Sequence, residues 1–183
     1  VHPAVPAKSV RELVALAKAK PSTMNFASGG NGSSPHLSGE LFKIVAAVQI
    51  THIPYKGSGP GVTDLLGGHV QMMFAGPLAL EQHIKSGRVR ALAVADKRRS
   101  VVLPDVPTMT EAGYPGIETG TWYGVLAPAR TTRNVVGRIH AAIVRSLQQP
   151  ELKSRIAAQG VDIVASGPDE FEKFIIAEVA KWS

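Results

Sequence analysis

Along the first two thirds of the chain, apolar positions alternate between helical spacing and short β-rich runs. The first helical stripe begins after Ser9, which forms a capping box with Glu12, and Pro21 ends it. Further helices are expected to start at the cap Ser34, at Pro60 and at Pro77, and strands to cover 25–27, 50–55, 69–74 and 89–95. Short strands that alternate with helices predict an α/β domain with a largely parallel sheet.

The pattern changes at the segment 121–128, which predicts one more strand. Beyond it the apolar stripes are helical, over 135–147, 152–156 and 171–182, and only a small strand at 161–164 is expected. These helices have very little sheet on which to bury their apolar faces. We therefore expect two parts with a boundary near 122–130, the second part packing on the first or on a part of the protein outside this chain.

Composition and charge exclude several classes of protein. Hydrophobic residues make up 44% of the chain and charged residues 19%, which is ordinary for a soluble globular protein. No apolar run approaches the roughly 20 residues that cross a bilayer. The net charge of +6 is typical of a solvated basic surface, and it also attracts anions. Only 5% of residues are aromatic and none interleaves with a basic stripe, so nucleic acid is not expected as a partner. The absence of cysteine excludes disulfides and thiolate chemistry.

A glycine-serine loop between a strand and a helix is the first candidate for chemistry. The residues with donor groups or flexible backbone are Ser28, Gly29, Gly30, Asn31, Gly32, Ser33 and Ser34, with His36 in the first helical turn. Glycines permit tight turns, and a helix start offers unpaired N–H groups and the positive end of its dipole. From the residues alone, an anion site and an ordinary connection with a structural cap are equally supported.

A second loop repeats this arrangement after the next strand. Tyr55, Lys56 and Gly57 lead into a Pro-started helix, and backbone N–H groups from Gly57 and Ser58 are better candidate donors than the Lys56 side chain. The phosphate-loop pattern G-x-x-x-x-G-K-[ST] is absent, which argues against nucleotide binding.

No catalytic or metal-binding set is found in the sequence. The six histidines show no H-x-x-x-H or H-E-x-x-H spacing, and no serine lies in a G-x-S-x-G elbow. We therefore expect neither an enzyme nor a bound metal or cofactor.

Several segments together resemble the periplasmic solute receptors of tripartite tricarboxylate transporters, the Bug-type receptors. The matching segments, in the order of that family, are VHPAVPAKSVRELVALAKAKP, NFASGGNGSSPHLSGELFK, HIPYKGSGPGVTDLLGGHVQMMF, VRALAVADKRRSVVLPDVPTMTEAGYPG, TWYGVLAPA and AAQGVDIVASGPDEF. They cover nearly the whole chain, and their combination is far more specific than any one of them.

The resemblance implies a type II periplasmic-binding-protein-like (Venus flytrap) fold without catalysis. Such receptors bind a di- or tricarboxylate between two lobes and deliver it to the membrane components of the transporter. Carried over to this sequence, the second lobe is 1–124, the C-terminal helical remnant of the first lobe is 125–183, and the protein is periplasmic. The implied ligand-binding residues are Ser28, Gly29, Asn31, Gly32, Ser33, Ser34, His36, Tyr55, Lys56, Gly57, Phe74 and Ala75.

Two departures from the family pattern affect these expectations. Many relatives have an aspartate after the phenylalanine of the third segment, where this chain has Ala75, which favours a plain carboxylate over an amino acid as ligand. The long stretch that forms most of the first lobe is also missing before Val1, so the chain resembles a truncated receptor. Its C-terminal helices would then contact a missing piece or a second copy, as in a domain-swapped or self-associated oligomer.

Two other functions remain as alternatives. The effector-sensing domain of a transcription regulator shares the two-lobed architecture and would need a helix-turn-helix segment upstream. An α/β enzyme would use the glycine loop for a phosphate, although the sequence lacks an acid-base or metal set.

Overall fold

The computed structural model describes residues 1–182, which divide into two compact units, Val1–Trp122 and the residues from Tyr123 onward. The sequence-based boundary lies two residues further along, between 124 and 125. None of the described helices is both long enough and apolar enough to span a bilayer.

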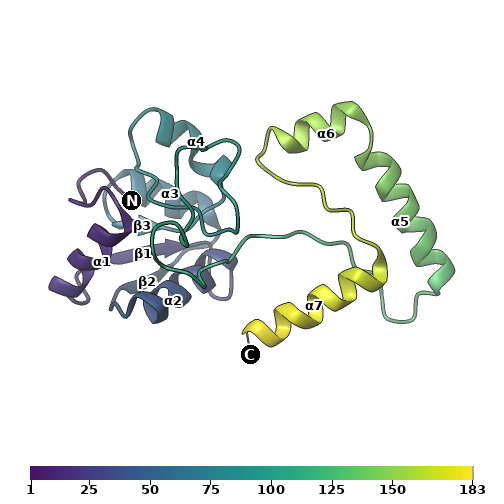
Figure 1. The fold of residues 1–183 in the computed structure, drawn as a ribbon, viewed down its shortest axis with the longest axis horizontal. Helices are drawn as coiled ribbons and strands as arrows, with labels where there is room; N and C mark the ends of the chain where they lie inside the picture. Colours follow the sequence, from purple (N-terminus) through teal and green to yellow (C-terminus); the bar gives the residue numbers. More distant parts are fainter. Residues whose placement is uncertain (183) are drawn as a thin grey trace. The chain divides into compact units, whose positions relative to one another are not determined.

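The first unit contains a small parallel sheet with helices on both faces (Figure 1). Its elements are α1 (Val10–Ala19), β1 (Asn25–Ser28), α2 (Ser34–Ala46), β2 (Thr51–Pro54), α3 (Ser58–Leu66), β3 (Met72–Met73) and α4 (Pro77–Lys85). β1 lies in the centre and pairs in parallel with β2 on one side and β3 on the other, in the order β2-β1-β3. The predicted α/β architecture with a parallel sheet is confirmed.

Alternate residues of the central strand face two separate apolar clusters. Phe26 is fully buried on the face covered by α1 and α2, where it packs in one cluster with Leu13 and Phe42. Ala27 faces the other side, in a cluster with Leu65 of α3. The side-chain period of two in a strand therefore gives the sheet two buried faces, as a doubly covered sheet requires.

Helix α2 approaches the sheet closely because Gly39 lies against the Phe26 ring. A Cβ built on Gly39 would lie 2.1 Å from Cε2 of Phe26, well inside van der Waals contact. Gly39 is buried in the middle of α2, so its lack of a side chain sets the distance between α2 and β1.

Several predicted element boundaries are wrong. The strand expected at 69–74 is only Met72–Met73, because the N–H groups of His69 and Val70 donate to the Asp64 carbonyl and complete the end of α3. The strand expected at 89–95 is absent, since the N–H of Arg90 bonds to Val1 while the N–H of Val94 bonds to Pro107, and no continuous ladder forms.

The second unit consists of α5 (Arg133–Leu147), α6 (Pro150–Ala157) and α7 (Pro168–Trp182), joined by extended segments. The three predicted helices are confirmed, but the strands expected at 121–128 and 161–164 do not form. A strand needs a hydrogen-bonded neighbour, and the described residues provide no neighbouring strand for either segment. Apolar side chains of the first segment are exposed instead, with Tyr123 at 83% and Leu126 at 72%.

We expect Gly39→Ala to destabilise the first unit by about 1–3 kcal/mol, because the added methyl group must displace the Phe26 ring or move α2. Gly59→Ala in α3 is the matched control, since a Cβ there meets nothing within 4 Å. It should leave stability unchanged or raise it by up to about 1 kcal/mol. Urea denaturation measures both variants, and equal midpoints would contradict this account of the α2–β1 contact.

Candidate functional site

The three loops singled out from the sequence follow the carboxyl ends of three parallel strands. Ser28 ends β1, Tyr55 follows β2 and Phe74 follows β3, so the parallel pairing places all three segments at one edge of the sheet. Helices α2, α3 and α4 begin directly after these loops. Since the free N–H groups and positive dipole ends of helices lie at their first turns, this edge suits a negatively charged ligand.

The loops after β1 and β2 are joined through their backbones. The N–H of Tyr55 donates to the Ser28 carbonyl at 3.1 Å, and the N–H of Gly57 donates to the Gly29 carbonyl at 3.1 Å. A Cβ on Gly29 would lie 3.2 Å from the Ser58 hydroxyl oxygen, and Gly57 has a φ of +100° that favours glycine. Glycine therefore permits the close approach of the two loops at position 29 and the backbone turn at position 57. The N–H of Gly57, expected as a donor to the ligand, is instead used by the Gly29 carbonyl.

The structure places Ser28 behind the loop and not on its surface. Its side chain is fully buried, and its hydroxyl oxygen lies 2.6 Å from Nε2 of His52 and 3.1 Å from both the nitrogen and the carbonyl oxygen of Gly30. The sequence predicted Ser28 as a donor to the ligand. Because the hydroxyl is enclosed by these partners, the geometry supports a role in shaping the loop instead.

The cap of α2 also differs from the prediction. Ser33, one residue before Ser34, is the N-cap, and its side chain makes no capping hydrogen bond. Its hydroxyl donates to the Gly30 carbonyl at 2.7 Å. Ser33 therefore closes the loop on itself, while Ser34 already belongs to the first helical turn.

His36 turns back toward the loop that precedes its helix. Its Nδ1 accepts a hydrogen bond from the N–H of Gly32 at 3.0 Å, and its Nε2 lies 3.9 Å from Oε1 of Glu40. An Nδ1 that accepts a hydrogen bond carries no proton. In this arrangement His36 fixes the loop through Nδ1, and only its Nε2 can form a hydrogen bond with a ligand.

The exposed rim of this edge carries few side-chain charges. Asn31, Gly32, Lys56 and Gly57 are exposed, and Ala75 is half-buried. Lys56 makes no ion pair with any described residue. The loop segments 28–36, 55–59 and 74–76 contain no acidic residue, so nothing within them repels a carboxylate.

Tyr55 is oriented by an acid of the following helix. Its hydroxyl donates to Oδ2 of Asp64 at 2.5 Å, and this hydrogen bond is the main reason that the pKa of Tyr55 is raised to about 12. The Tyr55 hydroxyl proton is therefore already donated to Asp64. The hydroxyl oxygen can still accept a hydrogen bond from another group.

His52 also belongs to this region, although the sequence did not indicate it as a site residue. It is the register partner of Phe26, so both side chains lie on the face covered by α2. Its ring stacks on Phe26 at 4.8 Å and on His36 at 4.0 Å between centroids. A single histidine in a strand gives no motif, and only the pairing of β1 with β2 reveals these contacts.

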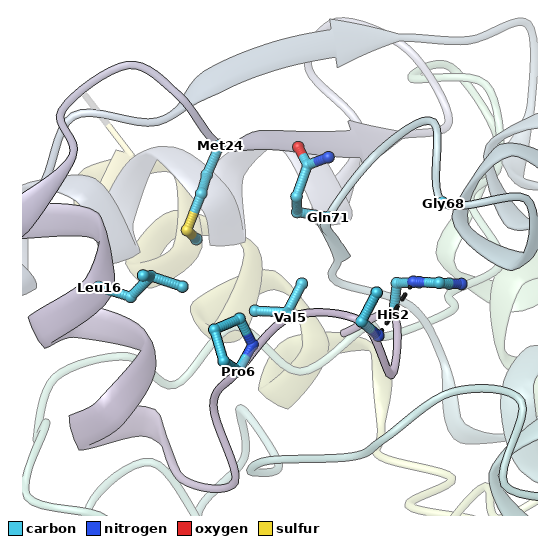
Figure 2. A pocket seen from close by; sticks show the side chains of 8 residues that line it. His2, Val5, Pro6, Leu16, Met24, Gly68 and Gln71 are labelled. Carbon is cyan, nitrogen blue, oxygen red and sulfur yellow. Dashed lines mark hydrogen bonds between the residues drawn. The ribbon is translucent and has the colours of Figure 1, made fainter.

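Two pockets in the first unit lie away from the predicted loops. One, of about 210 Å³, is lined by residues that include His2, Leu16, Met24 and Gln71 (Figure 2). Met24 and Gln71 directly precede β1 and β3, so this pocket lies at the amino end of the sheet, opposite the loops. The other, of about 580 Å³, lies between the start of α1 and the segment 105–107. Neither contains any of the twelve predicted ligand-binding residues.

Within residues 1–182, no three or more histidine, aspartate or glutamate side chains gather as metal ligands would. The chemistry of the loop edge is therefore that of backbone N–H groups, hydroxyls, one amide, one imidazole and one lysine.

Comparison with known proteins identifies the family. The sequence model of the tripartite tricarboxylate transporter family receptor matches residues 1–183. The chain belongs to this receptor family. Protein BugT of Bordetella pertussis is 39% identical over 182 residues, a match that covers 100% of this chain and 56% of BugT. The UPF0065 protein in the tcbD-tcbE intergenic region of Pseudomonas sp. strain P51 is 38% identical, over 96% of this chain and 52% of that protein.

Solved structures of receptors share the fold. The structure described as R. palustris Rpa4515 with adipate has a TM-score of 0.90 at 32% identity, over 100% of this chain and 61% of that one. Periplasmic binding protein BugD has a TM-score of 0.86 at 32% identity, and the match covers 97% of this chain and 60% of BugD. MatC from Rhodopseudomonas palustris with bound malate has a TM-score of 0.85 at 29% identity, and the match covers 97% of this chain and 61% of MatC. The chain thus has the α/β fold of periplasmic binding proteins and spans little more than half the length of these relatives.

The environment of His52 predicts a dependence of stability on pH. Burial is the main cause that lowers the pKa of His52 below the ordinary 6.5; His36 and Lys43 lower it further, and Glu40 opposes them. Below pH 6.5 the unfolded chain therefore binds a proton that the folded chain resists, so the free energy of unfolding falls as the pH drops. Melting temperatures of the wild type should decrease more steeply between pH 7 and about pH 5.5 than those of His52→Gln. Parallel curves for the two proteins would contradict this environment for His52.

Proposed function

We propose that this chain supplies a carboxylate-binding surface of a periplasmic solute receptor that serves a tripartite tricarboxylate transporter. The observation that carries the proposal is the convergence of three strand ends and three helix starts at one edge, with the first two loops joined by the Gly57-to-Gly29 hydrogen bond. Membership of the receptor family supports a receptor over a transcription regulator or an enzyme.

The proposed ligand contacts are the loop residues that the structure leaves accessible. The backbone N–H groups of Asn31 and Ser34 make no hydrogen bond to described residues, and they belong to the same edge of the sheet as exposed Lys56. A carboxylate accepts hydrogen bonds from N–H groups and is attracted by an ammonium group, and hydrogen bonds of this kind are stronger than neutral ones. Asn31 and Ser33 add polar side chains beside them.

The chemistry of the loops favours a small organic acid without an amino group. The segment after β3 reads Phe74-Ala75-Gly76, and no acidic side chain lies in the three loops to hold an ammonium group. Solved relatives described with adipate and with malate are in keeping with such a ligand. We propose a dicarboxylate, with one carboxylate held by the edge described above.

The direct test is isothermal titration calorimetry of the complete gene product with adipate, malate and the amino acids aspartate and glutamate. We expect saturable binding of at least one of the two dicarboxylates, weaker or no binding of the amino acids, and no turnover of any ligand. The absence of heat and of NMR shifts with both dicarboxylates would contradict the proposal.

A charge change at the loop tip tests where the ligand binds. Asn31→Asp places a negative charge beside the proposed site, and we expect the dissociation constant of the bound dicarboxylate to rise about tenfold, less at high salt. Gln49→Glu is the matched control, because it makes the same amide-to-acid change at an exposed position just before β2, at the opposite edge of the sheet. Equal effects of the two substitutions on affinity would exclude the loop as the ligand contact.

A further inference from the structure

We propose that His52 is a positioning residue for the 28–34 loop. It holds the loop in its ligand-binding conformation through Ser28 and His36, without contacting the ligand. This inference rests on the proposed function of the loop. It is carried by two different contacts of one imidazole, one through its ring edge and one through its ring face.

The edge contact acts through the buried hydroxyl of Ser28. Nε2 of His52 lies 2.6 Å from the Ser28 oxygen, which accepts from the N–H of Gly30 at 3.1 Å. Gly30 has a φ of +129°, so the loop bends sharply at this residue. With its oxygen held by His52, Ser28 can fix that bend from inside the protein.

The face contact acts through His36. The imidazole of His52 lies between the rings of Phe26 and His36, with interplanar angles of 27° and 25°. Nδ1 of His36 in turn accepts a hydrogen bond from the N–H of Gly32 at 3.0 Å. The stack therefore orients the ring that holds the second bend of the loop, where Gly32 has a φ of +74°.

The two contacts determine which N–H groups of the loop are already hydrogen-bonded within the protein. Those of Gly30 and Gly32 are occupied by Ser28 and His36, whereas those of Asn31 and Ser34 have no hydrogen-bond partner among the described residues. The N–H of Ser33 also donates, to the Gly30 carbonyl at 3.3 Å, so each unheld N–H, at Asn31 and at Ser34, directly follows a held one and is kept in a fixed position. His52 thereby contributes to affinity by preorganising the donors, which lowers the entropy lost on binding.

Three substitutions separate the two contacts. His52→Phe keeps a ring between Phe26 and His36 but removes the hydrogen bond to Ser28. His52→Gln places an amide nitrogen near the position of Nε2 but removes the stack, and His52→Ala removes both. His69→Gln is the matched control, because His69 is an exposed histidine just before β3, at the opposite edge of the sheet.

The first measurement uses the protein without ligand. We expect the amide signals and exchange rates of Gly30 to change in His52→Phe, those of Gly32 in His52→Gln and both in His52→Ala, with His69→Gln like the wild type. Melting curves show that each variant is folded under these conditions. Unchanged Gly30 and Gly32 amides in a folded His52→Ala would overturn the proposal.

The second measurement is the affinity for adipate and malate. Each lost contact should weaken binding by about two- to tenfold, the range that one net hydrogen bond supplies, and His52→Ala should lose more than either single-contact variant. An affinity in His52→Ala equal to that in His69→Gln would also overturn the proposal. Failure of the wild type to bind either acid would contradict the proposed function instead, and the amide measurement on the free protein distinguishes this from a failure of the His52 inference.

Discussion

Parallel hydrogen bonding of β1 with both of its neighbours is the constraint on which the rest of the first unit depends. Reversing either neighbour would send its loop to the opposite edge and separate the helix starts. The pairing also continues past the strands, since Tyr55 and Gly57 donate to Ser28 and Gly29 in the same direction. The shape of the candidate site is thus an extension of the sheet, and not an independent loop conformation.

The two faces of the sheet have different chemistry. On the α2 face, Phe26 and His52 are register partners, and aromatic stacking continues to His36 at the helix start. On the α3 face, Ala27 and Leu65 form an apolar cluster, and the polar contact beside it is the hydrogen bond from Tyr55, after β2, to Asp64 of α3. The polar network that shapes the first loop is therefore confined to one face, the face on which Gly39 brings α2 close.

The sequence predicted what depends on local signals. The Ser9 cap forms as expected, with the Glu12 N–H donating to the Ser9 hydroxyl at 3.2 Å, and the segment after Pro77 is helical. Strands were predicted poorly where their partners are distant in sequence, as at 89–95 and 121–128, because a β-rich run does not specify a neighbour. The same limit applies to the site: residue types marked the loops, but the inward turn of Ser28 and the role of His52 depend on cross-strand register.

Gly39 has a further consequence for α2 as a rigid body. The Phe26 ring fits only opposite a position without a side chain, and every residue within one turn of Gly39 on this helix has one. The helix therefore has a single axial register on the sheet, and sliding by a turn in either direction would drive a side chain into the ring. Its first turn consequently keeps a fixed height above the ends of β1 and β2, however the side chains of the loop vary.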